Sequence, residues 1–226
     1  MTAPAPGSIR FCFDYLSPYA YLAWTQVHAV AARHGRAVEP WPILFAAVLN
    51  ETGQRGPAEL PSERVYVFKD ALRTARLVGV PLQPPPRHPF NPLLALRVSA
   101  LPLEPAARKL LLDELYRRAW AGGGGVDGEE SVAAAITAVG LDAPAVLAAA
   151  VTPENKQRLK ENTATALADG VFGVPGMLVD GELYFGFHGG MTHLENHLSG
   201  KDPLRGMDLR GFASLPAGAV RPQSRT

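Results

Sequence analysis

Cysteine is almost absent from this sequence: Cys12 is the single cysteine among 226 residues. A disulfide within the chain is therefore excluded, which is typical of proteins from a reducing compartment. The first ten residues, MTAPAPGSIR, lack the positively charged start and apolar core of a secretory signal. We therefore expect a cytoplasmic protein.

Long hydrophobic runs and an excess of charge of either sign are also absent. No apolar segment approaches the roughly 20 residues of a transmembrane helix, and 22 basic against 21 acidic residues give a net charge of +1. Neither a membrane nor a nucleic acid is therefore expected as a partner, and no metal site is expected. Hydrophobic residues make up 47% of the chain, which is enough for a folded core.

Strand patterns lie near both ends of the sequence. Apolar residues alternate over 9–15, and the proline-containing segment 37–45 is typical of an edge strand. Asp180-Gly181 separates the short apolar runs 177–179 and 182–185, as in a type I′ hairpin. Helices are expected over 18–34, 64–77, 92–100, 105–120, 129–139, 144–150, 153–168 and 191–198.

This order of elements predicts an α/β fold in which both ends of the chain build one sheet around a helical insertion. We place the sheet domain at 8–45 and 168–200 and the insertion at 46–167. Residues 201–226 are rich in Gly, Pro and Arg, and we expect a poorly ordered tail there.

Ser17 and Pro18 stand where the first strand meets the first helix. Serine at the N-cap and proline at the next position form a favoured helix start, which is the structural interpretation of the pair. The same helix end exposes unpaired N–H groups and the positive end of the helix dipole, so it stabilises an anion such as a thiolate. Ser17 is able to cap the helix through a lone pair and to contact a sulfur through its proton.

The segment GVPG, residues 173–176, leads into the first strand of the predicted hairpin. Pro175 fits the first position of a strand, because it cannot donate to a ladder. In the functional alternative the Val174-Pro175 bond is cis, and the N–H and C=O of Val174 are free to pair with a peptide-like ligand.

The strand ending in FDYLSPYAYLA and the later segments GVFGVP and VDGELYFG together resemble the 2-hydroxychromene-2-carboxylate isomerase family. That family is related to kappa-class glutathione transferases and, more distantly, to DsbA-type thioredoxin-fold oxidoreductases. The resemblance extends over about residues 8 to 200 and includes ARHG, PILFAAVLNETG, RTARLVGVPL and HPFNPLLALR.

This resemblance implies a thioredoxin-like sheet with a large all-helical insertion, and glutathione as the cofactor. The redox relatives carry Cys-x-x-Cys where this sequence has Ser17-Pro18-Tyr19-Ala20, so dithiol exchange by the protein is excluded. Cys12 lies within the strand and is interpreted as a small buried residue. The resemblance implies that Ser17 contacts the glutathione thiol as the catalytic residue, and that Val174, before Pro175, pairs with the glutathione backbone.

One departure from the family concerns the segment after the hairpin. The family usually has Gly-x-Asp-Arg there, with the Asp expected to bind the γ-glutamyl amine, whereas this sequence has His188 at the Asp position. Losing a charge-assisted hydrogen bond costs about 1.5–3 kcal/mol, so weaker glutathione binding or a different thiol ligand is expected. His188 is equally compatible with a surface loop.

Further site residues are assigned by their position in the resemblance. Gln54 and Arg64 are candidates for contacts with the glutathione carboxylates, although either is as compatible with a solvated side chain. Asn91 is a candidate substrate-pocket residue, or else caps the following helix. Tyr19, Trp41 and Phe45 are candidates for an aromatic pocket, with core packing as the alternative for each.

Three hypotheses of function follow. In the first, a glutathione-dependent isomerase acts on a small conjugated aromatic substrate, and the protein lowers the thiol pKa and orients the reactants. In the second, a kappa-like transferase conjugates glutathione to electrophiles. In the third, a thioredoxin-fold module binds a ligand without catalysis. Because relatives are commonly dimers, a homodimer is expected.

Overall fold

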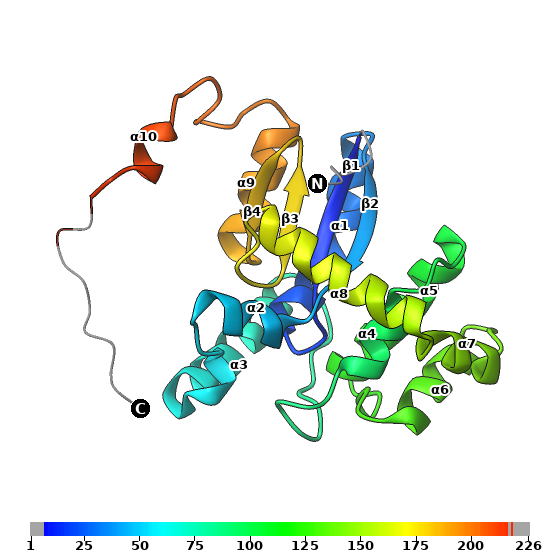
Figure 1. Cartoon of the computed structure of the whole chain (residues 1–226). Helices are drawn as coiled ribbons and strands as arrows, with labels where there is room; N and C mark the ends of the chain where they lie inside the picture. Colours follow the sequence, from blue (N-terminus) through cyan, green and yellow to red (C-terminus); the bar gives the residue numbers. More distant parts are fainter. Residues whose placement is uncertain (1–6, 217, 219–226) are drawn as a thin grey trace.

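A sheet forms from both ends of the chain in the computed structural model, which describes residues 7–216 and 218. Within these residues the strand order is β2-β1-β3-β4. β1 (Ser8–Phe13) runs parallel to β2 (Ala37–Pro42) and antiparallel to β3 (Gly176–Val179). β4 (Glu182–Phe185) pairs antiparallel with β3 (Figure 1). The order confirms the edge position predicted for the proline-containing strand.

The central strand β1 is buried on both faces, and its alternation separates two clusters of side chains. Phe11 and Phe13 face the helix α1 (Pro18–Arg33), where the Phe11 ring lies 5.5 Å from that of Trp24. On the other face Cys12 belongs to a smaller buried cluster, and Arg10 donates to Asp169 at 3.0 Å. The predicted strand pattern therefore corresponds to a strand at the centre of the core.

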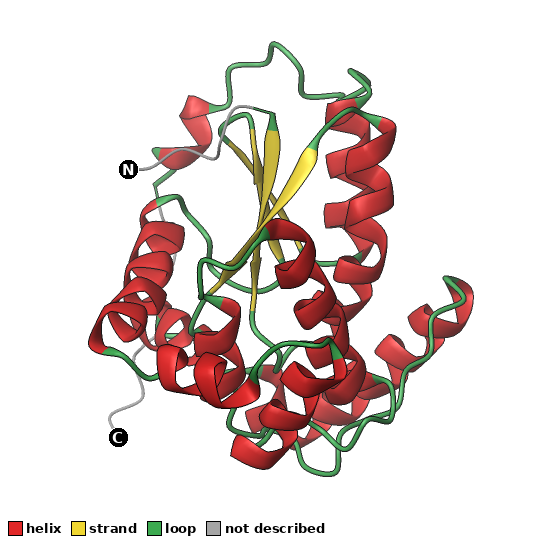
Figure 2. Cartoon of the chain, turned by 90° about the vertical axis from the view of Figure 1, so that its right-hand side faces the viewer, coloured by secondary structure: helices red, strands yellow, loops and turns green. Residues whose placement is uncertain are grey.

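Helices cover both faces of the sheet, as Figure 2 shows with the strands between them. α1 and α9 (His188–Leu198) pack on one face, and α8 (Pro153–Ala168) packs against β2 on the other (Figure 1). The turn between β3 and β4 has φ of 51° at Asp180 and 86° at Gly181. Both positive values are those of a type I′ turn, so the predicted hairpin is confirmed.

The region between β2 and α8 is helical, which confirms the predicted all-helical insertion. Most helices begin and end within three residues of their predicted bounds; α2 was not predicted as a separate helix. The bounds are α2 (Phe45–Thr52), the 3₁₀ helix η1 (Pro57–Glu59), α3 (Pro61–Leu77), α4 (Leu93–Ser99), α5 (Pro105–Trp120), α6 (Glu129–Ala138) and α7 (Ala143–Ala150).

α8 belongs by sequence to the predicted insertion but lies against the sheet. The indole N–H of Trp41 in β2 donates to the carbonyl of Asn162 at 2.9 Å, and the Leu44 N–H donates to the Thr163 hydroxyl at 3.0 Å. The division at residue 167 stays a prediction. In the predicted tail, 201–216 includes the short helix α10 (Arg210–Ala213), while 217 and 219–226 lie outside the described residues.

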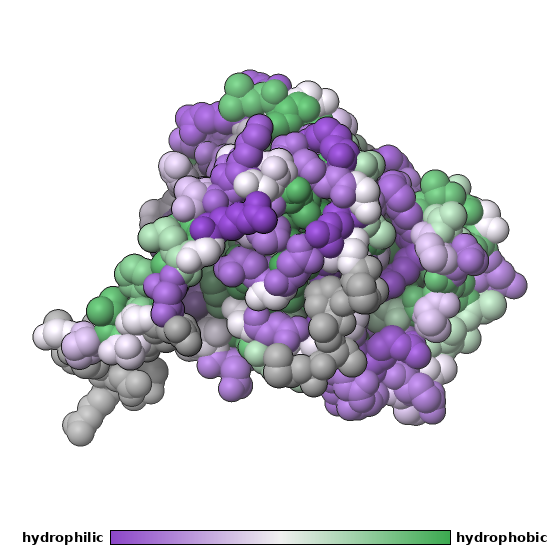
Figure 3. Space-filling view, turned by 90° about the horizontal axis from the view of Figure 1, so that it is seen from above, coloured by the Kyte–Doolittle hydropathy of each residue, from purple (hydrophilic) through white to green (hydrophobic). Residues whose placement is uncertain are grey.

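The end of the sheet that carries the hairpin turn is mainly hydrophilic, as the view from above in Figure 3 shows. β1 runs from this end toward the opposite one, where α2 and α3 lie (Figure 1). None of the described helices combines the length and the hydrophobicity that spanning a bilayer requires. The site described next lies at the far end of β1, where the strand passes into α1.

Candidate active site

Ser17 occupies the junction between β1 and α1. It is the N-cap of α1, with extended φ and ψ of −94° and 116°, and its Oγ accepts a hydrogen bond from the Ala20 N–H at 3.1 Å. Pro18 follows as the first helical residue, so the structural interpretation of the pair is confirmed. The Ser17 hydroxyl also donates to the carbonyl of Val174 at 3.3 Å, and only 8% of Ser17 is exposed.

The residues before Ser17 are held by side chains from the insertion. The Trp120 indole N–H donates to the Tyr15 carbonyl at 2.8 Å, and His88 Nε2 lies 2.8 Å from the Leu16 carbonyl. A carbonyl only accepts, so His88 Nε2 carries the proton in this contact. Burial lowers the pKa of His88, which the Leu16 contact opposes and the charge of Arg64 reinforces. The helical insertion thus fixes the backbone that presents Ser17.

A buried carboxyl joins the same junction to α2. Asp14 accepts hydrogen bonds from the Leu16 N–H at 3.0 Å and the Phe45 N–H at 3.1 Å. Burial raises the pKa of Asp14 to about 6, although the two N–H donors act in the opposite direction. Asp14 therefore fixes the start of α2 relative to the start of α1.

The loop before β3 forms the opposite side of Ser17. The Val174-Pro175 peptide bond is cis, as the functional alternative required. The expectation that both polar groups of Val174 are free is wrong for the carbonyl, because Ser17 donates to it. The Val174 N–H has no acceptor among the described residues. One backbone donor of this loop thus remains for a ligand.

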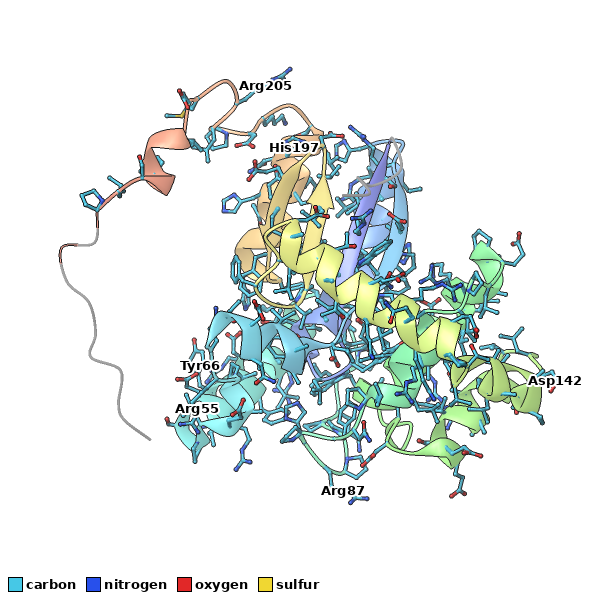
Figure 4. All side chains as sticks on the ribbon, viewed as in Figure 1. Arg55, Tyr66, Arg87, Asp142, His197 and Arg205 are labelled. Carbon is cyan, nitrogen blue, oxygen red and sulfur yellow. The ribbon has the colours of Figure 1, made fainter. Side chains whose placement is uncertain are left out.

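Ser17 and Val174 line one pocket of about 840 Å³. Its wall is mostly apolar and includes Phe45, Phe172 and Phe187. Arg55 and Tyr66, which also line it, lie on the same side of the molecule in Figure 4. A concave apolar pocket with a few polar groups is the usual form of a small-molecule site.

Three polar side chains from different helices meet at this pocket. The hydroxyl of Tyr19 in α1 donates to Asp70 Oδ2 of α3 at 2.6 Å, and Nε2 of His188 in α9 lies 2.8 Å from the same oxygen. Desolvation and the contact with Asp70 raise the pKa of Tyr19. Desolvation opposes the change at Asp70, but the hydrogen bonds from Tyr19 and His188 leave its pKa below the usual value. The cluster therefore places an ionised carboxylate beside His188.

The structure brings some of the sequence-predicted residues together and separates others. Gln54, Tyr19, Phe45 and His188 line the pocket with Ser17 and Val174. The remaining candidates, Pro175, Arg64, Trp41 and Asn91, are not among the pocket-lining residues.

Each separated candidate has another place in the structure. The guanidinium carbon of Arg10 lies 4.0 Å from the centre of the Trp41 ring, and the Trp41 indole N–H donates to the Asn162 carbonyl of α8. Asn91 Oδ1 accepts from the Leu93 N–H at 3.1 Å, although the N-cap of α4 is Pro92 and not, as its capping alternative predicted, Asn91. Pro175 O accepts from the Gly186 N–H at 2.9 Å, just beyond the open end of the β3–β4 hairpin. Arg64 is exposed on α3.

Asp70 and His88 escaped the sequence analysis. Asp70 lies within a polar helix and has no motif of its own, so only the packing of α3 against α1 reveals it. His88 begins the segment HPFNPLLALR, in which only Asn91 was a candidate site residue. Cys12, in contrast, is fully buried, and desolvation raises its pKa to about 12. This agrees with the interpretation of Cys12 as a structural residue.

No group of three His, Cys, Asp or Glu side chains able to hold a metal ion occurs in the described part of the chain. The polar groups at the pocket include the N-terminus of α1, the Ser17 hydroxyl and the Tyr19, Asp70 and His188 cluster.

Comparisons with known proteins show the same fold. A sequence profile of the DSBA-like thioredoxin domain matches residues 8–199. Glutathione S-transferase kappa 1 of Caenorhabditis elegans is 28% identical over 182 residues, which cover 76% of this chain and 80% of the relative. 2-hydroxychromene-2-carboxylate isomerase of Sphingobium xenophagum is 28% identical over 195 residues, covering 84% and 97%. A solved 2-hydroxychromene-2-carboxylate isomerase superposes with a TM-score of 0.77 at 25% identity, over 85% of this chain and 94% of that one.

Proposed function

Because the chain belongs to the DSBA-like thioredoxin domain family, we propose that it is a glutathione-dependent isomerase of the 2-hydroxychromene-2-carboxylate type, acting on a conjugated aromatic substrate. The observation that carries the proposal is the meeting of Ser17 and Val174, 157 positions apart, within hydrogen-bond distance at one apolar pocket. Relatives with either a glutathione transferase or an isomerase name cover most of the chain.

The start of α1 suits a thiolate. Pro18 has no N–H and the Ala20 N–H is taken by Ser17, while the Tyr19 N–H has no acceptor among the described residues. This donor and the helix dipole favour an anion at that point. The Ser17 hydroxyl donates to the Val174 carbonyl over 3.3 Å, which is about 0.5 Å longer than a typical O–H···O hydrogen bond. This hydrogen bond is therefore weak, and the Ser17 hydroxyl is available to donate to a sulfur instead.

The polar groups of glutathione match what the pocket leaves unpaired. The Val174 N–H is a donor for a carbonyl of the tripeptide, as in strand addition. Asp70 Oδ1 accepts no hydrogen bond from the described residues, so it suits an ammonium group. In this proposal Asp70 supplies the negative charge that His188 lacks. Gln54 lines the same pocket and is proposed to contact a carboxylate.

When bound, glutathione would supply a thiolate nucleophile that adds reversibly to a conjugated substrate. The protein's own contribution is to hold the sulfur beside Ser17, to exclude water and to orient the aromatic ring. Phe45, Phe172 and Phe187 belong to the apolar wall of the pocket and are proposed to contact that ring. Because aromatic rings pack well against one another, this wall favours a planar substrate.

A kappa-like transferase is the second candidate, favoured by the relative from Caenorhabditis elegans. It would use the same thiolate site and differ in its product. A panel of conjugated aromatic acids and of electrophiles separates the two activities: an isomer free of glutathione indicates the isomerase, and a thioether product indicates the transferase. The homodimer and the cytoplasmic location stay predictions.

The first experiment is a calorimetric titration of the full chain with glutathione, for the wild type and for Ser17→Ala. We expect binding that is saturated at millimolar glutathione in the wild type and weakened in the variant. S-methylglutathione, which cannot form a thiolate, should bind both proteins alike. If the wild type binds neither ligand, the pocket serves another molecule, and both enzyme candidates are rejected.

A further inference from the structure

Tyr19, Asp70 and His188 form a connected cluster that the thiolate site itself does not require. They come from α1, α3 and α9, and all three line the pocket that contains Ser17. The Tyr19 hydroxyl and His188 Nε2 approach the same oxygen, Asp70 Oδ2, at 2.6 Å and 2.8 Å. Such an arrangement orients a histidine ring by means of a carboxylate.

The contact determines which nitrogen of His188 carries a proton. An ionised carboxylate only accepts hydrogen bonds, so the Nε2 that approaches Asp70 must be the donor. This leaves Nδ1 as the nitrogen whose lone pair is available when the ring is neutral. Nδ1 has no hydrogen-bond partner among the described residues, and the side chain is 58% exposed. Nδ1 is therefore open to a hydrogen bond from a ligand.

We propose that His188 is the proton-transfer residue of this pocket, and that its Nδ1 takes the proton of a bound thiol. The inference rests on the proposed function. The S–H bond breaks, an N–H bond forms at Nδ1, and the product is a thiolate beside an imidazolium that Asp70 stabilises. When the sulfur later leaves the substrate, the same proton returns from Nδ1, so no further reactant is consumed.

The other polar residues of the pocket are less suited to this step. The Ser17 hydroxyl donates a hydrogen bond to the Val174 carbonyl and is not placed to take a proton from a thiol. His88 Nδ1 is buried without a partner among the described residues, and its Nε2 is held by Leu16. Glu59 Oε1 accepts from the Gly56 N–H at 2.8 Å and caps η1. His188 combines an oriented ring with an accessible nitrogen.

The groups that surround His188 are consistent with the role. Asp70 and Arg73 lie on α3, Tyr19 lies on α1, and the Tyr19 ring packs edge to face against His188 at 5.7 Å between centroids. Tyr66 on α3 adds a further phenol near Tyr19. Asp70 accepts a hydrogen bond from the His188 ring, and the charge of Arg73 contributes to lowering the pKa of Asp70.

The test uses the full chain and the variant His188→Gln. Glutamine keeps an N–H donor for Asp70 but has no basic nitrogen. His193→Gln, on the same helix but outside this pocket, is the matched control. Glutathione is titrated at slightly alkaline pH while thiolate is followed by its ultraviolet absorbance. Calorimetry in two buffers of different ionisation enthalpy counts the protons released on binding.

In the wild type and in His193→Gln we expect thiolate to form with far less than one proton released for each thiolate. His188→Gln should bind glutathione but show less thiolate, with each remaining thiolate releasing one proton, and its turnover should fall about 100-fold.

Full thiolate formation with one proton released in the wild type overturns the inference, because Ser17 and the helix dipole then suffice. Loss of glutathione binding in His188→Gln also overturns it, since His188 is then a binding contact. Absence of binding in the wild type rejects the proposed function itself.

Discussion

Two helices of this protein begin with the same local pattern, and only one of these beginnings lies at the pocket. α1 starts with Ser17-Pro18 and α8 with Thr152-Pro153, each with a hydroxyl N-cap followed by proline. Ser17 Oγ accepts from Ala20 at 3.1 Å, and Thr152 Oγ1 accepts from Asn155 at 3.3 Å. As helix caps the two residues are equivalent.

The difference lies in the carbonyl to which each hydroxyl donates its hydrogen bond. Thr152 donates to Ala149, three residues earlier in the chain, at 3.2 Å. Ser17 donates to Val174, which only the pairing of β3 with β1 brings to it. The comparison teaches that a capping pattern accounts for the helix, and that the partner supplied by the fold makes one cap a candidate for chemistry.

The largest effect is expected from removing the two hydroxyls in parallel. Ser17→Ala and Thr152→Ala should each lower the free energy of unfolding by about 1 kcal/mol, because each loses a cap. Turnover should fall about 100-fold in Ser17→Ala alone, as for the loss of a donor to a developing anion. Urea unfolding and steady-state rates measure the two quantities. Equal rates in both variants would remove the functional distinction between the two caps.

A second difference is that α1 contributes Tyr19 to the cluster with Asp70 and His188 at the pocket, which includes a carboxylate. Asp70→Asn should weaken glutathione binding by about tenfold to a hundredfold, since a charged partner of an ammonium group is lost. Asp180→Asn is the matched control, because Asp180 also contacts an arginine and a histidine but lies at the hairpin turn. Calorimetric affinities decide the matter, and an equal loss in both variants would indicate a general electrostatic effect.

A third difference is the buried carboxyl at the start of α1. The pKa of Asp14 is raised to about 6 by burial, so the folded protein binds a proton more tightly than the unfolded chain. Stability should therefore fall as pH rises from about 4 to about 7, by on the order of 3 kcal/mol, and change little from this group above that. Asp14→Asn should lack this decline in urea unfolding measured across the window. A decline of the same size in the variant would assign it to other groups.

The smallest effect is expected on the α8 side of the comparison. Trp41→Phe removes the indole donor to Asn162 and should cost about 1 kcal/mol of unfolding free energy. Glutathione affinity should stay unchanged, because Trp41 does not line the pocket. Tyr19→Phe, which removes a donor from the pocket cluster, is the contrasting variant. A matching loss of affinity in both would mean that the two sides of the sheet are coupled.

Much of the fold was predictable because its signals are local. Alternating apolar residues in β1, the proline that begins α8 and the Asp180-Gly181 turn each restrict the backbone within a few residues. Ser17 and Val174 were nominated from the sequence, through the resemblance of their motifs, and the structure brings them together at one pocket, while their roles stay predictions. Asp70 was not, because a carboxylate in the middle of a polar helix has the same sequence pattern whether it faces solvent or a pocket.

Trp41 shows the same limit of prediction from sequence, here for a residue that was expected at the pocket and is not there. An aromatic residue in an edge strand suits a pocket or a core equally well, and the choice depends on what packs against it. Arg10 and α8 cover Trp41, whereas α2, α3 and the loop before β3 leave the pocket open beside Ser17. These neighbours come from distant parts of the sequence, so no local pattern records them.

The sequence by itself determined the α/β class, the hairpin, most helix bounds and the absence of a dithiol, since each depends on residue type and short-range geometry. Tertiary structure alone decided that Ser17 faces Val174, that Asp70 joins Tyr19 and His188, and that Trp41 is turned away from the pocket. The physical reason is distance along the chain: these contacts join residues that are 51 to 157 positions apart, and only packing of the whole core brings them together.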